Sequence, residues 1–345
     1  MTRTLTCLCL ASFMLVLGAC APVTEETAVP AVPGDPNRSI VNVTGDLYRA
    51  RSNQHFTVFL VTDEGIILSD PINREFATWL RSELETRFAV PVRYVLYSHS
   101  HYDHASGGGV FADTAEFVGH ENMRQALADP NPDTPLPANA QELDTDGNGT
   151  LEAAEAAGNF QSNFALFDAD GDGSLSGGEI ARGPVGDVHP PTTVYTDRHT
   201  VTLGGRTVEM IHPGPAHSAD MSVISFPEES ALFVVDFISL KRLPFQTFAG
   251  SGPLDAWLDE MRAIEAMGAE IVIPGHGAVG TTEDVAEHRR YLEELRDAVA
   301  EGIAAGRSLE EMQETILMES YSGWGNYEEW RTLNIEGMYG LLSEE

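Results

Sequence analysis

Four side chains of the kinds that bind metal ions lie within six consecutive residues of this 345-residue chain: His99, His101, Asp103 and His104. They follow the apolar run 92–97 and precede a glycine-rich stretch. In an extended segment alternate residues point the same way, so His99 and His101 can face one ion. The turn that follows then offers Asp103 and His104 to a second ion. A solvated polar loop is the alternative interpretation, but three histidines and an acid seldom gather after an apolar strand by chance.

Three more candidate ligands occur farther along the chain. His217 lies in Gly-Pro-Ala-His-Ser, and His276 lies in Pro-Gly-His-Gly after the predicted strand 270–273. Asp236 closes the apolar run 231–235, where a charge is costly unless it is paired or bound to a metal. All three cysteines fall within the first twenty residues. A metal site in the rest of the chain therefore has to use imidazole and carboxylate ligands.

Taken together, these motifs resemble the metallo-β-lactamase superfamily, whose pattern His-x-His-x-Asp-His is followed by a His, an Asp and a final His. The resemblance covers roughly residues 40–130 and 190–300, and it implies an α/β fold, a four-layer αβ/βα sandwich. It also implies two ions that share one aspartate: His99, His101 and His217 bind the first, Asp103, His104 and His276 the second, and Asp236 bridges them. Asp70 matches an earlier acidic motif of the family, which supports the site without binding metal.

The ligand types favour two Zn²⁺, although a carboxylate-bridged pair can also take Fe or Mn. Two neighbouring cations lower the pKa of a shared water toward ~7. We therefore expect a metallohydrolase in which a metal-bound hydroxide, oriented by Asp103, attacks an ester, thioester, lactone or lactam bond of a small molecule. With aspartate at position 236, the chain resembles the glyoxalase-type thioesterases and lactonases more than the β-lactamases. β-Lactamase activity proper is therefore the second hypothesis. A calcium-dependent interaction protein on an inactive metallohydrolase scaffold is the third.

Lys241, the only lysine in the chain, lies five residues beyond Asp236. We interpret it as a catalytic-site residue that holds a substrate carboxylate, with a surface ion pair as the alternative. The other histidines are interpreted as surface or core residues: His55, His120, His189, His199, His212 and His288.

Two twelve-residue stretches, 144–155 and 168–179, have the ligand spacing of a calcium-binding loop. Oxygen-bearing side chains occupy positions 1, 3 and 5, a glycine at position 6 permits the turn, and a glutamate ends each loop. The two loops resemble an EF-hand pair, which implies two Ca²⁺. The candidate calcium ligands are Asp144, Asp146, Asn148, Thr150, Glu152, Glu155, Asp168, Asp170, Asp172, Ser174, Ser176 and Glu179.

The role of this calcium is open between three hypotheses. The flanking helices are predicted to be short, which favours a structural role over the large opening of a calcium sensor. The position of the pair between the first metal motif and His217 raises a second possibility, a wall or lid of the active site. The third is a docking module that binds a protein partner only in calcium.

The N-terminus resembles a bacterial lipoprotein signal, in which Arg3 and the apolar run 8–17 precede Leu-Gly-Ala and Cys20. A segment of this kind is a secretion signal rather than part of the fold. We expect a lipidated Cys20 anchored in the bilayer of the bacterial cell envelope, at the outer membrane facing the periplasm. An ordinary signal peptide is the alternative. Residues 20–38, rich in Pro, Ala and Glu, are predicted to be a flexible tether.

The apolar pattern predicts the elements that must position these motifs. Strands are predicted at 56–61, 66–69, 92–97, 115–118, 200–203, 207–211, 221–226, 231–236 and 270–273, and helices at 72–88, 254–267 and 282–305. The predicted order is signal peptide 1–19, tether 20–38, catalytic domain 39–130 and 190–305, EF-hand insertion 131–189 and helical extension 306–345. The formal net charge of −33 excludes nucleic acid as a partner, because phosphate binding needs clustered Lys and Arg.

Overall fold

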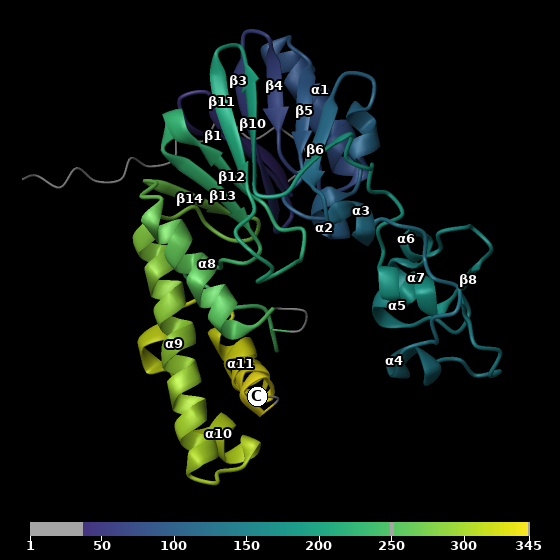
Figure 1. The fold of residues 1–345 in the computed structure, drawn as a ribbon, viewed down its shortest axis with the longest axis vertical. Helices are drawn as coiled ribbons and strands as arrows, with labels where there is room; N and C mark the ends of the chain where they lie inside the picture. Colours follow the sequence, from purple (N-terminus) through teal and green to yellow (C-terminus); the bar gives the residue numbers. More distant parts are fainter. Residues whose placement is uncertain (1–36, 249–251, 344–345) are drawn as a thin grey trace, which may run out of the picture.

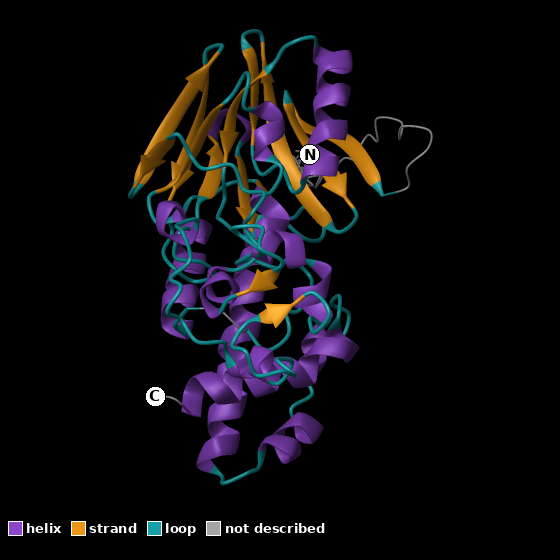
Figure 2. Cartoon of the chain, turned by 90° about the vertical axis from the view of Figure 1, so that its right-hand side faces the viewer, coloured by secondary structure: helices purple, strands orange, loops and turns teal. Residues whose placement is uncertain are grey.

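Two facing sheets form the upper part of the molecule in Figures 1 and 2. The computed structural model describes residues 37–248 and 252–343. The larger sheet has seven strands in the order β1-β2-β3-β4-β5-β6-β9, and the smaller has five in the order β10-β11-β12-β13-β14. Both sheets are mixed, with β4-β5-β6-β9 and β13-β14 running parallel and the other neighbours antiparallel.

The strands fall close to the predicted apolar runs. The larger sheet contains β1 Arg38–Thr44, β2 Leu47–Ser52, β3 His55–Thr62, β4 Gly65–Leu68, β5 Val92–Leu96, β6 Glu116–His120 and β9 Thr193–Tyr195. The smaller contains β10 Arg198–Leu203, β11 Arg206–Ile211, β12 Val223–Phe226, β13 Ala231–Val235 and β14 Ile271–Pro274. The hairpin β10–β11 turns at Gly204 and Gly205, whose φ angles are 55° and 75°. Two consecutive positive φ angles suit a two-residue turn whose twist matches that of the flanking strands.

Helices cover the outer face of each sheet, which gives four layers. Helix α1 (Arg74–Phe88) is capped by Asn73, whose side chain accepts the N–H of Phe76. Its buried Phe76, Leu80 and Leu84 pack on the larger sheet. Helices α8 (Leu254–Ala266) and α9 (Thr282–Ala304) pack on the smaller sheet. The remaining short helices near the sheets are α2 Tyr102–Ala105, α3 Met123–Ala126, η1 Gly108–Phe111 and η2 Pro227–Glu229.

The inner faces of the sheets form one apolar core. Leu60 and Leu96 of the larger sheet lie in the same fully buried cluster as Val208 and Phe233 of the smaller. Burial of each such side chain contributes about 1.5–3 kcal/mol. The expected α/β sandwich is therefore confirmed, and both of its sheets are mixed.

The C-terminal residues add α10 (Leu309–Thr315), η3 (Glu319–Tyr321) and α11 (Tyr327–Ser343). Helix α11 lies beside α9 (Figure 1), and the hydroxyl of Tyr291 on α9 donates to Oδ1 of Asn334 on α11 at 2.7 Å. Both groups are buried, so this hydrogen bond joins the C-terminal residues firmly to the sandwich.

Residues 131–189, between β6 and β9, form a separate lobe beside α2 and α3 (Figure 1). Its two short strands pair antiparallel, with Leu151 opposite Leu175. These leucines, Ala156 and Phe167 form a small apolar cluster of the lobe's own. The elements of the lobe are α4 Ala138–Gln141, β7 Leu151–Glu152, α5 Gly158–Ser162, α6 Phe164–Phe167, β8 Ser174–Leu175 and α7 Gly177–Arg182.

The first hairpin, β1–β2, and the short strand β9 were not predicted. Most residues of β1 are only partly buried, so its alternation of polar and apolar residues is weak. The turn between the two strands, Gly45-Asp46, was the available signal. The predicted signal peptide, the lipidated Cys20 and most of the tether lie outside the described residues. Within the described part of the chain, no helix combines the length and hydropathy that a membrane span requires.

Candidate metal centre

Parallel strands of both sheets end at one edge of the sandwich, and the predicted site residues follow them there. Asp70 comes after β4 and His99 after β5, which are parallel neighbours. Asp236 comes directly after β13, and His276 follows β14, again a parallel pair. Carboxyl ends of parallel strands meet at the same edge of a sheet, which is where α/β proteins place their sites. His217 comes from the loop between β11 and β12.

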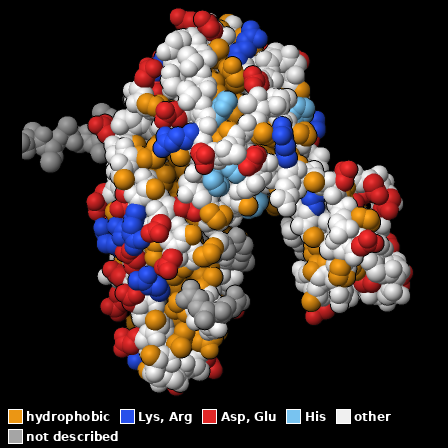
Figure 3. Space-filling model, viewed as in Figure 1, with side chains coloured by type: hydrophobic (Ala, Val, Ile, Leu, Met, Phe, Trp, Pro, Cys, Tyr) orange, Lys and Arg blue, Asp and Glu red, His pale blue; other side chains and the backbone are white. Residues whose placement is uncertain are grey.

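All seven predicted transition-metal ligands come together at this edge. Within each group, one ligand atom from each residue lies within 4.8 Å of the others. In Figure 3, histidine side chains gather on the surface between the C-terminal helices and the inserted lobe. The groups are His99, His101, His217 and Asp236, and Asp103, His104, Asp236 and His276.

Asp236 belongs to both groups and turns one oxygen toward each. Its Oδ2 lies 3.7 Å from Nε2 of His99 and 3.6 Å from Nε2 of His217. Its Oδ1 lies 3.2 Å from Nε2 of His104 and 3.4 Å from Nε2 of His276. This is the arrangement of a carboxylate that bridges two ions.

The spacing and the burial of the donor atoms both fit bound metal. Four ligands at zinc distances of 2.0–2.1 Å in a tetrahedron lie ~3.3 Å apart. Nε2 of His217 is 3.1 Å from Nδ1 of His101, and the Nε2 atoms of His104 and His276 are 3.2 Å apart. Nε2 of His99 and Oδ1 of Asp236 are buried without a hydrogen-bond partner among the described residues. Buried polar atoms are almost always satisfied, so these two fit a metal ion as their partner.

Asp70 lies behind the ligands, as predicted for a supporting residue. It is fully buried and accepts the backbone N–H of Ser98 at 2.8 Å and the Ser98 hydroxyl at 2.6 Å. Because that hydroxyl donates to Asp70, it accepts from Nδ1–H of His99, 2.8 Å away, which leaves Nε2 free for metal. Burial raises the pKa of Asp70 to about 6, against the lowering effects of His104 and of the Ser98 hydrogen bonds.

His55 was missed by the sequence interpretation, which treated it as a surface or core residue. It begins β3, and its Nε2 lies 3.3 Å from Oδ2 of Asp103. Its ring centroid lies 4.6 Å from that of His276. The adjacent N–H of Phe56 donates to the carbonyl of Gly275, which brings the start of β3 to the site. No local motif marks His55, because its partners come from distant segments.

Glu260 on α8 is a second missed residue, and it shapes the loop that carries His217. Its two carboxylate oxygens lie 3.1 and 3.3 Å from the backbone N of Ala216, and burial raises its pKa to about 7. Gly214 has a φ of 136°, and a Cβ there would come within 2.2 Å of Oε1 of Glu260. Glycine is therefore required where this loop passes the carboxylate.

A cavity of about 400 Å³ opens at the metal ligands, a size typical of small-molecule sites. Its lining includes five of the metal ligands, His101, Asp103, His217, Asp236 and His276, together with His55. The other lining residues are largely apolar and include one cation. Among them are Ile238, Arg242, Phe245, Phe248 and Trp257.

Lys241 does not line this cavity, which departs from the prediction that it holds a substrate carboxylate. Its amine pairs with Glu287 and lies 3.2 Å from Asp284, both on α9. Lys241 has a φ of 52°, and the chain turns so that the next residue, Arg242, faces the cavity instead. The surface ion pair, weighed as the alternative, is what the structure contains.

The predicted calcium ligands lie in the inserted lobe, away from the seven-ligand site (Figure 1). Two groups of carboxylates have oxygens within 4.8 Å of one another: Asp144, Asp146 and Glu155, and Asp168, Asp170 and Glu179. The other six candidates, Asn148, Thr150, Glu152, Asp172, Ser174 and Ser176, lie in the same two loops. At position 6 of the loops, Gly149 and Gly173 have φ angles of 87° and 86°.

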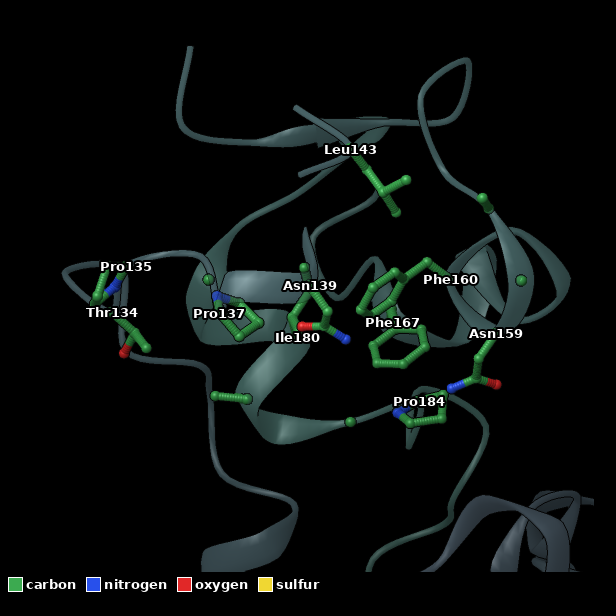
Figure 4. A pocket seen from close by; sticks show the side chains of 15 residues that line it. Thr134, Pro135, Pro137, Asn139, Leu143, Asn159, Phe160, Phe167, Ile180 and Pro184 are labelled. Carbon is green, nitrogen blue, oxygen red and sulfur yellow. The ribbon is translucent and has the colours of Figure 1, made fainter. Parts of the chain in front are cut away.

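The lobe also contains an apolar cavity of about 740 Å³. Figure 4 shows Phe160 and Phe167 at its centre, between Leu143 and Pro184. The two rings lie 5.6 Å apart at 64°. This cavity holds none of the seven predicted transition-metal ligands.

Comparisons with known proteins identify the family of this chain. The family model of the metallo-beta-lactamase superfamily matches residues 53–276. The chain is 22% identical over 251 residues to 2,4-dinitroanisole O-demethylase subunit alpha from Nocardioides sp. (strain JS1661), covering 72% of this chain and 60% of that one. It is 25% identical over 218 residues to a linear primary-alkylsulfatase from Pseudomonas sp. (strain ATCC 19151), covering 61% and 38%. The chain thus spans less than two thirds of the length of either relative.

Two solved structures share the fold. A metallo-beta-lactamase from Pontibacter korlensis superposes with a TM-score of 0.52 at 17% identity, covering 74% of this chain and 99% of that one. The stereoselective inverting sec-alkylsulfatase Pisa1 from Pseudomonas sp. superposes with a TM-score of 0.62 at 16% identity, covering 88% and 50%. At these identities the likeness concerns the fold alone.

Proposed function

This chain belongs to the metallo-β-lactamase superfamily and is a hydrolase of that fold with a His/Asp dinuclear site; from that premise we propose that it cleaves an ester, thioester, lactone or lactam bond with two Zn²⁺. The observation that carries the proposal is Asp236, whose two carboxylate oxygens face separate sets of histidines. Two bound cations supply an activated water and polarise the bond under attack.

The protonation state and the orientation of Asp103 are set by neighbouring residues of the chain. Burial raises the pKa of Asp103, but the hydrogen bond from His55 and the nearby His104 outweigh it and bring that pKa to about 2. Asp103 is therefore ionised at neutral pH and can accept a hydrogen bond from an attacking water. His55 donates to Oδ2 of Asp103, which fixes the direction in which the carboxylate points.

Aspartate at position 236 supports an ester, thioester or lactone over a β-lactam, because β-lactamases proper usually have cysteine or no ligand there. A second candidate function is sulfate-ester hydrolysis. It is favoured by the alkylsulfatase relative and by the apolar residues that line the cavity, which suit an alkyl chain.

The test is metal analysis followed by turnover. The purified chain, loaded with zinc, is assayed on a panel of lactams, lactones, thioesters, carboxylic esters and alkyl sulfates. We expect about two zinc ions per chain and turnover that drops at least 100-fold in His101→Ala. The matched control is His199→Gln on β10, a histidine outside both metal groups. Absence of transition metal, or full turnover in His101→Ala, contradicts the proposal and favours an interaction protein on an inactive scaffold.

We also propose that the two acidic loops of the inserted lobe bind Ca²⁺ as an EF-hand pair. The support is the carboxylate grouping in each loop and the backbone pairing of Leu151 with Leu175 between them. Oxygen ligands at these positions are those that calcium prefers. The proposed role is structural, since all four helices of the lobe have six residues or fewer.

The test of calcium binding is calorimetric titration of the full chain with Ca²⁺. We expect two sites in the wild type and one in Glu179→Gln. Asp133→Asn, an exposed acid of the lobe outside both loops, is the control and should keep two. A single unchanged stoichiometry across the three proteins contradicts the proposal.

We further propose that the chain is a lipoprotein anchored through Cys20 in the bacterial envelope, facing the periplasm. The support is the run Leu-Gly-Ala-Cys after a short apolar segment. Detergent phase partitioning of the chain expressed in a bacterium tests it. The wild type is expected in the detergent phase and Cys20→Ala in the aqueous phase. Equal partitioning of the two contradicts the proposal.

A further inference from the structure

We propose that the active-site cavity binds an organic anion: Arg242 pairs with its negative group, and the aromatic wall formed by Phe245, Phe248 and Trp257 holds its apolar body. The C-terminal residues, through Asn334, hold residues 241–248, the segment that carries Arg242, Phe245 and Phe248, in place. The proposal deepens the proposed hydrolase function and rests on it for the scissile bond, whereas the binding itself is measured without turnover.

Arg242 is the binding group for the charge. It lines the cavity, and its Nε is buried without a hydrogen-bond partner in the described part of the chain. No carboxylate of residues 37–248 and 252–343 lies within ion-pair distance of its guanidinium, although acids outnumber bases 53 to 20 in the chain. Burial lowers the pKa of Arg242, so its charge is poorly solvated. A partly buried guanidinium without an anionic partner gains from pairing with a carboxylate or similar anion.

The surroundings of Arg242 leave it available to a ligand. Its guanidinium carbon lies 4.6 Å from the ring centroid of Trp330, which supports the charge from one side only. Its neighbour Lys241 is held by Asp284 and Glu287. Of these two adjacent cations, Lys241 is thus part of a surface ion pair, whereas Arg242 faces the cavity.

The wall beside Arg242 is aromatic. The indole N–H of Trp257 donates to the carbonyl of Phe237 at 2.7 Å, so its polar atom is satisfied and its ring presents apolar surface. Phe248 lies 5.8 Å from Trp257 at 80°. Phe245 lines the cavity and is 62% exposed. A large apolar side chain exposed beside a site suits contact with an alkyl or aryl group.

Residues 241–248, the segment that carries Arg242, Phe245 and Phe248, need support from the rest of the chain. Three of these eight residues have left-handed backbone. Lys241, Gln246 and Phe248 have φ angles of 52°, 44° and 59°. Such residues persist where the surrounding structure holds them, and they occur often at binding sites. The supporting contacts come from the C-terminal residues.

Two parts of the C-terminal residues hold the segment. The N–H of Gly325 donates to the carbonyl of Lys241 at 2.9 Å, and the N–H of Leu243 donates to the carbonyl of Gly325 at 3.0 Å. The fully buried Asn334 donates from Nδ2 to the carbonyls of Pro244 and Gln246, at 3.0 and 2.6 Å. Its Oδ1 accepts from Tyr291. Asn334 is thus a positioning residue for the segment that bears Arg242 and the two phenylalanines.

The test is a matched pair of ligands that differ only in charge. Binding of 4-phenylbutyrate and of 4-phenyl-1-butanol to the zinc-loaded full chain is followed by tryptophan fluorescence, since Trp257 and Trp330 lie at the site. We expect the acid to bind at least about tenfold more tightly. Arg242→Met should abolish that preference, and Arg242→Lys should restore part of it. A preference that survives Arg242→Met assigns the charge recognition to the metals and overturns the proposal.

A sulfate monoester tests where the anion lies. If decyl sulfate competes with 4-phenylbutyrate and loses affinity in Arg242→Met to the same degree, Arg242 recognises the anion whether it is carboxylate or sulfate, as proposed. If decyl sulfate binding is unchanged in that variant, its head group lies at the metals and Arg242 is not a general anion site. If the zinc-loaded wild type prefers the acid over the alcohol but turns over no substrate of the panel, only the hydrolase function is contradicted.

The positioning role has its own variants. Asn334→Ala should reduce the preference for the acid while zinc content stays the same, and Glu336→Gln, an exposed residue on the same helix, should change neither. If Asn334→Ala does not fold, Tyr291→Phe removes the hydrogen bond to Oδ1 and keeps the ring. Unchanged ligand preference in the folded variant contradicts the role given to Asn334.

Discussion

The hydroxyl of Ser98 lies 2.6 Å from the carboxylate of Asp70, and the same oxygen is 2.8 Å from Nδ1 of His99. The Ser98 hydroxyl thus links the buried carboxylate of Asp70 to the metal ligand His99 through two hydrogen bonds. An outer group of this kind fixes the tautomer and the orientation of the ligand. Because Asp70 is fully buried, its hydrogen bonds to Ser98 are not weakened by competing water.

Replacing Asp70 by Asn should weaken metal binding without removing a ligand. The loss of the charged acceptor lets the Ser98 hydroxyl turn, and Nε2 of His99 is no longer held toward the metal. We expect about a 10–100-fold loss of zinc affinity, measured by competition with a chromogenic chelator. Asp63→Asn, in the exposed turn before β4, is the control. Equal zinc affinity in the two variants would show that Asp70 has no such role.

Gly275 lies so close to the site that one added carbon should disturb it. A Cβ there would come within 2.8 Å of both Oδ1 of Asp236 and Cε1 of His104. Gly275→Ala should therefore lower zinc affinity and turnover at least about tenfold through displaced ligands. Gly340→Ala on α11 has open space around the new carbon and should be neutral or slightly stabilising. Wild-type zinc content and turnover in Gly275→Ala would refute the close packing described for this site.

His288 should make the fold sensitive to acid. Burial lowers its pKa from 6.5 to about 3, and its Nδ1 accepts the N–H of Ser239. In the unfolded chain His288 takes up a proton near pH 6.5, while the folded chain resists protonation until about pH 3. Stability is therefore full above pH 6.5 and falls as the pH drops toward 3, by up to about 3 kcal/mol at pH 4.

The measurement for His288 is the urea midpoint at pH 7.5 and at pH 4. His288→Gln keeps an acceptor for Ser239 without the titration, so its midpoint should fall less than that of the wild type. His199→Gln is the control and should follow the wild type. All three chains keep the same metal ligands, so acid release of metal affects them alike. An equal fall in His288→Gln excludes His288 as a source of the acid sensitivity.

Calcium should raise the melting temperature of the wild type. Binding to the folded chain stabilises it by about 2.7 kcal/mol per site at a ligand concentration of 100 times Kd, which corresponds to a rise of about 3 °C or more. The double variant Glu155→Gln/Glu179→Gln should show no rise, as measured by scanning calorimetry. An equal rise in both proteins would place the effect elsewhere in the chain.

The lid hypothesis for the inserted lobe is checked on the wild type by measuring KM with and without Ca²⁺. Two residues of the lobe form hydrogen bonds with the segment that follows the metal ligands His99 and His101. The carbonyl of Asp187 accepts the N–H of Gly107. The side chain of Asn163 donates to the hydroxyl of Tyr102 at 3.5 Å. A structural role predicts the same KM in both conditions. A KM that rises several-fold without calcium supports a lid.

The seven ligands could be predicted because each one belongs to a short motif or ends an apolar run. Asp236 shows this well, since a carboxylate after five buried residues needs a partner. His55 could not be predicted, because it reaches Asp103 only through the pairing of β3 with the rest of the sheet. The position of Lys241 outside the cavity could not be predicted either, because it depends on a left-handed residue in an irregular segment. Sequence periodicity says nothing about the direction of a side chain in such a segment.

Each set of metal ligands draws on both sheets. His99, His101, Asp103 and His104 follow β5 of the larger sheet, whereas His217, Asp236 and His276 come from loops of the smaller sheet. An ion held by either set would therefore cross-link the two halves of the sandwich, much as a disulfide joins two segments. Neither half can assemble a complete set alone, so bound ions would add to the apolar core in holding the two sheets together.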